Sequence, residues 1–254
     1  MSNAGGGTTL SAVAVIPARF ASTRLPGKPL LEVAGATLIE HVWRRASRAG
    51  RVSRVLVVTD DRRILSAVRS FGGEARLTSS EHPTGSDRIG EVLDELPEEV
   101  VLNVQGDEPE VDPDLLDRLI RRLEEDERLA AVTAAAPITT SGLLQDPNAV
   151  KVVLDAGQRA LYFSRSPIPG SRPGATEAPP AALLHLGVYA YRREALRRFL
   201  SLPQGRLERQ EGLEQLRLLE NGMSIGVVLV EQAHQGIDTP EDFEAFRARM
   251  EGGP

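Results

Sequence analysis

Short apolar runs alternate with amphipathic stretches through the first half of this 254-residue chain, and that alternation constrains the fold more than any other feature. Continuous apolar runs, typical of strands buried on both faces, lie at 12–16, 55–59 and 100–104. Stretches with helical spacing of apolar residues lie at 38–49, 62–71, 87–96 and 113–127. Strands that alternate with helices form βαβ units with right-handed crossovers, so the sequence predicts an α/β fold with a mainly parallel sheet. The predicted helix N-caps are Asp61, Ser86 and Asp112.

The second half keeps the strands but loses the regular rhythm. Further strands are predicted at 129–136, 150–154, 184–191 and 225–230, and further helices at 192–200, 207–220 and 240–250. The segment 166–180 holds five prolines, which predicts an excursion from the sheet. Since neither a repeat nor a long linker interrupts the pattern, we expect one domain over residues 11–251. Residues 1–10 are small and polar and are expected to form a disordered lead-in.

Composition enters where it excludes functions. With 30 basic and 36 acidic residues the net charge is -6, which argues against a general nucleic-acid binder. The chain has no cysteine, so disulfides, thiolate zinc sites and cysteine nucleophiles are excluded. With only four histidines, a bound metal would be held mainly by oxygen, which favours magnesium or manganese. No apolar run approaches the ~20 residues of a membrane span, so we expect no membrane partner and a cytoplasmic protein.

The segment Val15–Leu30 follows the first predicted strand and carries the strongest functional signal. It contains three prolines, one glycine and the cations Arg19, Arg24 and Lys28. Proline removes ladder donors, so this segment is predicted to be a loop at the carboxyl end of the strand. Open α/β sheets bind anionic ligands at that edge. We therefore expect the three cations to hold a triphosphate and to neutralise charge on a leaving pyrophosphate.

Lysine usage singles out two positions. Of the 30 basic residues only Lys28 and Lys151 are lysines, and the other 28 are arginines. An ammonium is a compact point charge on a flexible stem, whereas the guanidinium is a planar fork. A functional role is therefore predicted for Lys28, while for Lys151 a functional and a structural role remain equally open.

Two acidic segments follow strands in the same way. Asn103–Pro109 comes after the strand at 100–104 and contains Asp107 and Glu108. Gly236–Asp242 comes after the last strand, where Asp238 or Thr239 is the expected cap of the helix that begins at residue 240. Carboxylates beside phosphates are unfavourable unless a cation lies between them, so Asp107 is predicted to bind Mg²⁺, with Asp238 as a possible second ligand.

Weaker signals come from four other segments. His82–Arg88 is a glycine-containing turn that leads into a helix, where backbone amides could meet an anion or a base edge. Arg165 could hold a carboxylate bidentately. His185 and Tyr189 lie four residues apart on a predicted strand and so face one side. Glu214 and Gln215 could bind sugar hydroxyls. A capped helix start explains the turn equally well, and each of the other residues, taken alone, is more often structural.

Seven segments, in this order, resemble one family of enzymes. They are Ile-Pro-Ala-Arg-Phe-Ala-Ser-Thr-Arg-Leu-Pro-Gly-Lys-Pro-Leu, Asn-Val-Gln-Gly-Asp-Glu-Pro, Pro-Asn-Ala-Val-Lys-Val-Val, Tyr-Phe-Ser-Arg, His-Leu-Gly-Val-Tyr, Leu-Glu-Gln-Leu-Arg and Asp-Thr-Pro-Glu-Asp. This pattern is similar to that of the 3-deoxy-manno-octulosonate (Kdo) cytidylyltransferases and extends from about residue 12 to residue 250. The first loop is shared with other sugar nucleotidyltransferases, while the histidine and glutamate segments are more specific to Kdo activation.

The resemblance implies a three-layer nucleotidyltransferase fold with a mixed, mainly parallel sheet and a small dimerisation excursion in the second half. It also implies a homodimer that uses Mg²⁺ to convert CTP and Kdo into CMP-Kdo and pyrophosphate for lipopolysaccharide biosynthesis. The implied catalytic residues are Arg19, Lys28, Asp107 and Asp238, of which Asp107 and Asp238 hold the metal. The implied nucleotide-binding residues are Pro17, Ala18, Arg19, Arg24, Lys28, Thr84, Gly85, Arg88 and Gln105. The implied sugar-binding residues are Gln105, Arg165, His185, Tyr189, Glu214 and Gln215.

Three alternatives stay open at this point. The nearest alternative is a nucleotidyltransferase for another acidic sugar, such as an 8-amino Kdo or a sialic-acid-like compound, although the sialate enzymes have a different first loop. A non-catalytic nucleotide-sugar-binding protein would not need Asp107 and Asp238 together. An arginine-rich nucleic-acid binder conflicts with the net charge of -6 and with the aromatic content of 4%.

Overall fold

The structure is a computed structural model that describes all residues except 1–8, 22–23, 171–181, 233–235 and 253–254. Outside those gaps the chain forms two compact units. The first unit comprises Leu10–Arg118 and the C-terminal residues from 236 onward, and the second is built from Leu119–Ala233. Most of the expected lead-in and most of the proline-rich excursion at 166–180 lie outside the described residues.

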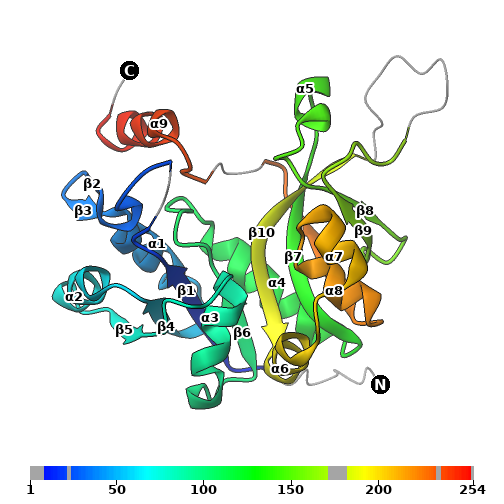
Figure 1. The fold of residues 1–254 in the computed structure, drawn as a ribbon, viewed down its shortest axis with the longest axis horizontal. Helices are drawn as coiled ribbons and strands as arrows, with labels where there is room; N and C mark the ends of the chain where they lie inside the picture. The colour runs from blue at the N-terminus through cyan, green and yellow to red at the C-terminus, as the bar shows by residue number, and fades with distance from the viewer. Residues whose placement is uncertain (1–8, 22–23, 171–181, 233–235, 253–254) are drawn as a thin grey trace, which may run out of the picture. The chain divides into compact units, whose positions relative to one another are not determined.

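A parallel sheet forms the core of the first unit. Its strands lie in the order β6 (Val100–Asn103), β1 (Ala12–Ala18), β4 (Val52–Thr59) and β5 (Glu74–Leu77) (Figure 1). β1 and β6 are almost entirely buried because they are covered on both faces. The three apolar runs in this part of the sequence are therefore confirmed as strands, while β5, which carries two charged residues, was missed.

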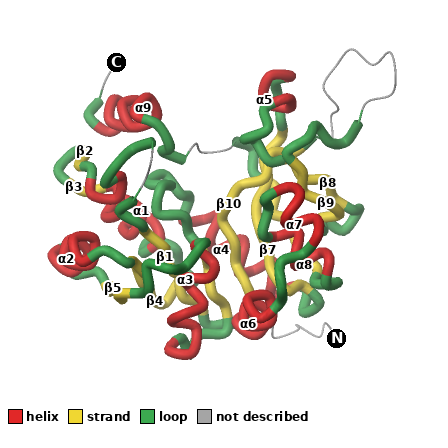
Figure 2. The backbone as a smooth tube through the Cα atoms, in the orientation of Figure 1, coloured by secondary structure: helices red, strands yellow, loops and turns green. Residues whose placement is uncertain are grey.

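Helices connect these strands, as the alternation predicted (Figure 2). α1 (Leu38–Ala46) joins β1 to β4, α2 (Arg62–Ser70) joins β4 to β5, and α3 (Gly85–Val92) joins β5 to β6. The connections through α1 and α2 move along the sheet from β1 toward β5, whereas the connection through α3 moves back from β5 to β6. Because all three crossovers are right-handed, α3 covers the face of the sheet opposite to α1 and α2. The unit therefore has three layers. α4 (Pro113–Glu125) follows β6, and α9 (Pro240–Met250) ends the chain.

The helix caps are mostly those predicted. Asp61 accepts a hydrogen bond from the backbone N–H of Arg63 at the start of α2. Thr239 caps α9 in a reciprocal capping box with Asp242. The prediction of Ser86 as the cap of α3 was wrong. Thr84 has the extended backbone that a cap requires, and its hydroxyl accepts from the backbone N–H of Asp87, three residues further on.

The second unit contains a mixed sheet. Its strands lie in the order β11 (Ser224–Leu229), β7 (Leu129–Pro137), β10 (Leu183–Arg192), β8 (Lys151–Leu154) and β9 (Ala160–Ser164). β11 is parallel to β7, and the other pairs are antiparallel. Together the two units confirm the predicted α/β class with parallel and mixed pairing.

Four helices accompany this sheet: α5 (Ser141–Gln145), α6 (Arg193–Ser201), α7 (Arg206–Glu211) and α8 (Gln215–Glu220). A single helix over 207–220 was predicted, and that prediction was wrong. Gly212 takes a φ of +64°, a left-handed conformation that ends α7 and turns the chain into α8. α8 then packs against β9.

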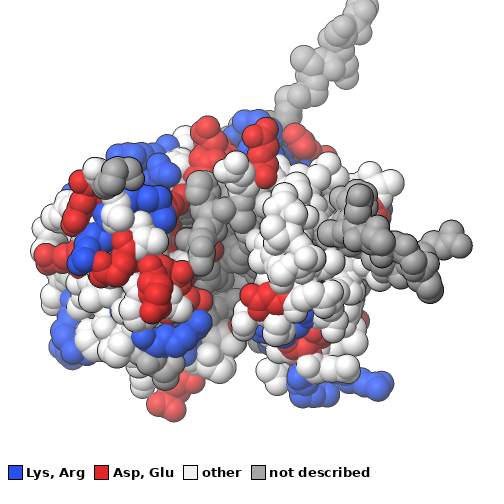
Figure 3. Space-filling view, turned by 90° about the horizontal axis from the view of Figure 1, so that it is seen from above, with Lys and Arg blue, Asp and Glu red and all other residues white. Residues whose placement is uncertain are grey.

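Within the described part of the chain, no helix is both long and apolar enough to span a bilayer. Figure 3 shows basic and acidic side chains interspersed in the left part of the view, whereas the right part is largely white. Such a mixed surface agrees with the net charge of -6 and does not resemble the continuous basic field of a nucleic-acid binder.

Candidate functional site

The cationic loop of the first unit turns back on itself after β1. The backbone N–H of Gly27 donates to the carbonyl of Phe20, and Gly27 has a φ of +70°. A side chain there would be strained and would come within 3.1 Å of the Phe20 ring, so glycine is required. The Arg63 guanidinium covers that ring at 3.3 Å. Lys28 then begins a short 3-10 helix, Lys28–Leu30, which precedes a small hairpin of β2 (Glu32–Val33) and β3 (Ala36–Thr37).

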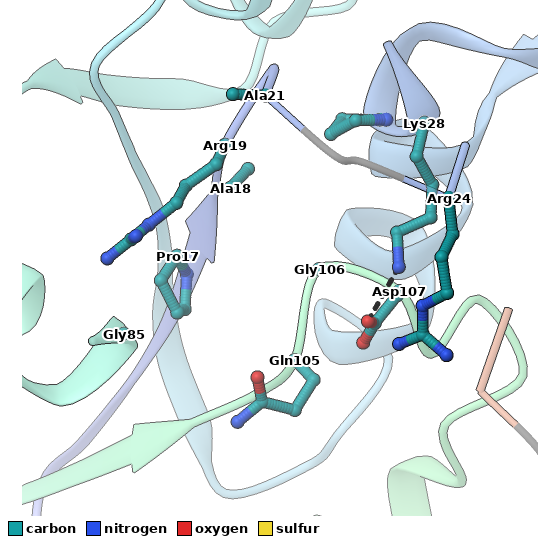
Figure 4. A pocket seen from close by; sticks show the side chains of 11 residues that line it. Pro17, Ala18, Arg19, Ala21, Arg24, Lys28, Gly85, Gln105, Gly106 and Asp107 are labelled. Atoms are coloured by element: carbon teal, nitrogen blue, oxygen red, sulfur yellow. Dashed lines mark hydrogen bonds and ion pairs between the residues drawn. The ribbon is translucent and has the colours of Figure 1, made fainter. Parts of the chain in front are cut away.

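A cavity of about 360 Å³ opens where this loop meets the loop after β6 (Figure 4). Its lining consists of Pro17, Ala18, Arg19, Ala21, Arg24, Lys28, Pro29, Gly85, Gln105, Gly106 and Asp107. A Cβ on Gly106 would lie 2.8 Å from the carbonyl oxygen of Pro17, so only glycine allows the two strand ends to approach so closely. The cavity has the size of a small-molecule site.

Lys28 lies at the centre of the polar wall of this cavity. Its Nζ donates to Asp107 Oδ2 at 2.8 Å, to the carbonyl oxygen of Ile237 at 2.7 Å and to Asp238 Oδ1 at 3.2 Å. These three acceptors match the three donors of an ammonium group. The backbone N–H of Ile237 also donates to the carbonyl of Asp107 at 2.9 Å, which holds the two acidic segments together. The structure therefore brings together Lys28, Asp107 and Asp238, which the sequence analysis had selected for one site.

The two arginines of the loop occupy different sides of the cavity. Arg24 pairs with Asp238 through Nη2 and Oδ2 at 3.1 Å, and its side chain is 64% exposed. Arg19 lies across the cavity, on the side of Pro17 and Gly85, where it donates to the carbonyl of His82 (Figure 4). A ligand between them would meet positive charge from both sides.

Asp107 and Glu108 differ in their surroundings. Asp107 is partly exposed and pairs with Lys28. Burial, reinforced by the charge of Asp107, raises the pKa of Glu108 to about 8. The two neighbouring carboxyl groups therefore differ in how readily they lose a proton, and it is Asp107 that lines the cavity.

Oxygen atoms from three residues converge on the Nζ of Lys28, a residue that lines the cavity. Asp107, Ile237 and Asp238 all lie within 3.2 Å of Lys28 Nζ. Among the described residues, no cluster of three or more Asp, Glu, His or Cys side chains suited to a metal occurs. Two carboxylates and a carbonyl are nevertheless hard oxygen ligands, and Mg²⁺ usually completes its shell with water and substrate phosphates. The donor set fits that ion.

Of the residues predicted to surround the nucleotide base, one lines this cavity and two make hydrogen bonds within the protein. Gly85 lines it, and a Cβ there would meet Pro17 at 3.1 Å. The Thr84 hydroxyl caps α3: it accepts from the backbone N–H of Asp87 and donates to the carboxylate of the same residue. Arg88 is fully buried and donates to Asp60 and Thr78, so its guanidinium supports the turn.

In the second unit, His185 and Tyr189 face one side of β10, as predicted. Their ring centroids lie 5.4 Å apart, even though the register of β10 shifts between Leu186 and Tyr189. Phe163 of β9 packs edge-on against His185 at 5.0 Å. Burial lowers the pKa of His185 to about 3 and raises that of Tyr189. The Tyr189 hydroxyl is buried without a hydrogen-bond partner that meets normal geometry among the described residues.

Arg165 is held by Glu211, which the sequence analysis did not select. The Glu211 carboxylate accepts from the Ser164 hydroxyl at 2.8 Å and from the backbone N–H of Arg165 at 2.9 Å. Arg165 Nε donates to the Glu211 carbonyl at 2.8 Å, and Nη1 donates to that of Pro147 at 3.0 Å. The guanidinium is thus oriented by backbone oxygens and keeps further Nη donors for a ligand.

The remaining predicted residues are placed as follows. Glu214 precedes α8, and its charge adds to burial in raising the pKa of both Tyr189 and Tyr191. Gln215 begins α8 and is buried. Lys151 is completely buried, which decides between its two possible roles: its Nζ donates to backbone carbonyls only.

Sequence reasoning missed several residues of both sites. Ala21 and Pro29 line the cavity but carry no chemistry that a sequence displays. Thr133 lies beside His185, and it is the one polar residue within an apolar strand, Ala-Ala-Val-Thr-Ala-Ala-Ala. That interruption was the available signal.

Comparisons with known proteins agree with this geometry. A family model described as cytidylyltransferase matches residues 13–225. A 3-deoxy-manno-octulosonate cytidylyltransferase of Syntrophobacter fumaroxidans is 49% identical over 236 residues, which cover 92% of this chain and 94% of the relative. The protein of the same name from Syntrophotalea carbinolica is 44% identical over 249 residues, covering 96% of this chain and all of the relative.

Among solved structures, that of a CMP:2-keto-3-deoxy-manno-octonic acid synthetase complexed with CTP is similar to this chain with a TM-score of 0.90 and 42% identity. The similarity covers 95% of this chain and 98% of the other. It confirms the fold class predicted from the sequence.

Proposed function

The chain belongs to the 3-deoxy-manno-octulosonate cytidylyltransferase family, as its motifs indicated, and we propose that it activates Kdo with CTP. In this reaction the anomeric hydroxyl oxygen of Kdo attacks the α-phosphorus of CTP in line. The bond from that phosphorus to the β-phosphate oxygen breaks, the hydroxyl loses its proton, and CMP-Kdo and pyrophosphate are formed. The product serves lipopolysaccharide biosynthesis.

One observation carries the proposal: the loop cations and Asp107 line a single cavity, and Asp238 pairs with two of those cations, Arg24 and Lys28. Phosphoryl-type transfer asks the protein mainly for positioning and for neutralisation of charge. Arg19 and Arg24 approach from opposite sides and hold the β- and γ-phosphates. No side chain has to act as a covalent nucleophile.

Asp107 and Asp238 are proposed to hold Mg²⁺, because their carboxylates already converge on one cation position. The bound ion would polarise the α-phosphate and offset its charge. If Asp107 and Asp238 held the ion, the Lys28 ammonium that now donates to them would be released to bind the phosphates. This exchange explains why a flexible lysine serves here better than an arginine.

The sugar acid is assigned to the residues that the resemblance implies. Arg165 has Nη donors left for a carboxylate, as an acidic sugar requires. His185, Tyr189 and Gln215 provide hydrogen-bonding groups for hydroxyls, and Gln105 lines the nucleotide cavity. We also propose that the protein is a cytoplasmic homodimer. The proposal of a dimer rests on the resemblance of the sequence to the family.

Pyrophosphate release tests the proposal. We expect release with CTP, Mg²⁺ and Kdo, and little with ATP, GTP or UTP or with sialic acid in place of Kdo. Pyrophosphate release should be abolished when Mg²⁺ is omitted and a chelator is added. Absence of release with CTP and Kdo would contradict the proposed function, whereas release with sialic acid would move the substrate to another acidic sugar.

A further inference from the structure

Thr133 holds an unusual position in the second unit. It is completely buried in the middle of β7, between apolar neighbours. Its Oγ1 lies 2.9 Å from the carbonyl oxygen of Leu186 and 2.8 Å from that of Val188, in the irregular part of β10. The same Oγ1 lies 3.1 Å from His185 Nε2. One hydroxyl therefore meets two backbone carbonyls and one ring nitrogen.

The number of hydrogens available determines which group donates in each contact of Thr133. A threonine hydroxyl has one hydrogen, and a carbonyl oxygen can only accept. With two carbonyls at 2.8 and 2.9 Å, that hydrogen is needed between Oγ1 and the carbonyls. The contact with His185 then requires the hydrogen to come from Nε2. His185 is thus the Nε2–H tautomer, and its Nδ1 carries a lone pair.

The ring of His185 is fixed on its other sides. Phe163 packs against it edge-on with an interplanar angle of 78°, and Tyr189 lies at 54° to it. His185 is partly buried, and among the described residues Nδ1 has no hydrogen-bond partner. Because burial lowers the pKa of His185 to about 3, the ring stays neutral near pH 7 and keeps this lone pair.

We propose that Thr133 is a positioning residue that holds His185 as the Nε2–H tautomer, so that Nδ1 accepts a hydrogen bond from a hydroxyl group of the sugar acid. The identity of the ligand rests on the proposed function, whereas the tautomer rests on the geometry of Thr133. A hydroxyl group can donate to Nδ1. A carboxylate or phosphate oxygen at that place would oppose one lone pair to another.

The tautomer thereby contributes to the orientation of the substrate. The carboxylate of the sugar acid is excluded from His185 and is accepted by the Nη donors of Arg165. The opposite tautomer, with the hydrogen on Nδ1, would admit the carboxylate at both places and would lose this discrimination. Thr133 acts only through His185 and touches no substrate atom in this scheme.

The first test reads the tautomer directly and needs no substrate. The imidazole ¹⁵N shifts are measured in protein labelled at its four histidines, and the His185 signals are identified by their loss in H185Q. We expect a protonated Nε2 and an unprotonated Nδ1 in the wild type and in T133S, which keeps the hydroxyl. T133V removes the acceptor and should give a mixture of tautomers. A protonated Nδ1 in the wild type would overturn the proposal, even if T133V failed to fold.

The second test concerns the substrate. In T133V the KM for Kdo should rise about tenfold, the loss of one well-placed hydrogen bond, while the KM for CTP stays near that of the wild type. T133S should restore the KM for Kdo. A changed tautomer with an unchanged KM for Kdo would refute the role in recognition. If the wild type activates no acidic sugar at all, the proposed function fails, but the ¹⁵N result still decides the tautomer.

Discussion

The two lysines of the chain make the same number of hydrogen bonds in two opposite environments. Lys28, in the loop of the first unit, donates to two carboxylates and one carbonyl. Lys151, on β8 of the second unit, donates to the backbone carbonyls of Asp146, Ala149 and Arg165. Burial lowers the pKa of Lys151, whose side chain is fully enclosed.

The difference separates a site that can exchange its partners from one that cannot. Carboxylates that are a third to a half exposed, as at Lys28, remain hydrated when the ammonium leaves. Buried carbonyls around Lys151 have no such alternative, because an unpaired buried acceptor costs free energy. We infer that Lys28 moves during the reaction, while Lys151 ties the turn at 146–149 to Arg165. The following experiments break or sharpen this contrast.

Asp107→Asn should have the largest effect. The change removes the charge from one of two proposed metal ligands without altering the shape of the side chain. We expect turnover to fall about a thousandfold, as for the loss of a preorganised electrostatic group, with the melting temperature nearly unchanged. Steady-state pyrophosphate release and a thermal melt measure both. Turnover within a few fold of the wild type would exclude Asp107 from the reacting cation site.

Lys151→Met should affect stability most. The change leaves three buried carbonyls without their donor, and we expect the free energy of unfolding to fall by about 3 kcal/mol. Lys28→Met is the matched control: its partners can be hydrated, so the loss should stay below about 1 kcal/mol. Urea unfolding of both variants measures the difference. If both variants lost the same free energy of unfolding, the solvent exposure of the lysine's hydrogen-bond partners would not determine the loss.

Local features of the sequence predicted most of the fold and which charged side chains meet at the first cavity. Proline and glycine after a buried strand fix a loop, and parallel strands bring such loops to one edge, so Lys28 and Asp107 were placed correctly. One failure was a choice between two capping residues that lie two positions apart. Ser86 lost the cap to Thr84, whose backbone is extended.

The second site was less predictable because many of its contacts are made to backbone carbonyls. The role of Lys151 depends on carbonyls at 146, 149 and 165, and that of Arg165 depends on Glu211. Backbone carbonyls occur at every residue, so no sequence pattern reveals which ones a lysine will meet. A polar residue inside an apolar strand, such as Thr133, is the exception, since burial forces it to find a partner.

Lys28→Arg tests whether charge alone suffices at the exchanging site. A planar guanidinium cannot direct its donors to two aspartates and a carbonyl as a compact ammonium does. We expect kcat/KM to fall on the order of thirtyfold, about 2 kcal/mol of transition-state stabilisation. Arg24→Lys, at a position that is 64% exposed, keeps the charge in a less restricted place and should lose only a few fold. Similar losses in both variants would argue against a special role for lysine.

The smallest effect is expected from the pH dependence of the second unit, where groups are kept neutral by burial. The pKa of His185 is lowered to about 3 by burial, whereas an unfolded chain has a histidine pKa near 6.5. Below pH 6.5 the unfolded state therefore binds a proton that the folded state does not, and this residue lowers stability increasingly as the pH falls from 6.5 toward 3.

Urea unfolding should show that the wild type loses about 1 kcal/mol more than His185→Gln between pH 6 and pH 5. Between pH 7 and pH 8 the two proteins should change in parallel. Parallel curves over the acidic interval as well would mean that His185 titrates freely in the folded protein, and the contrast between an exchanging charged site and a permanently neutral one would be lost.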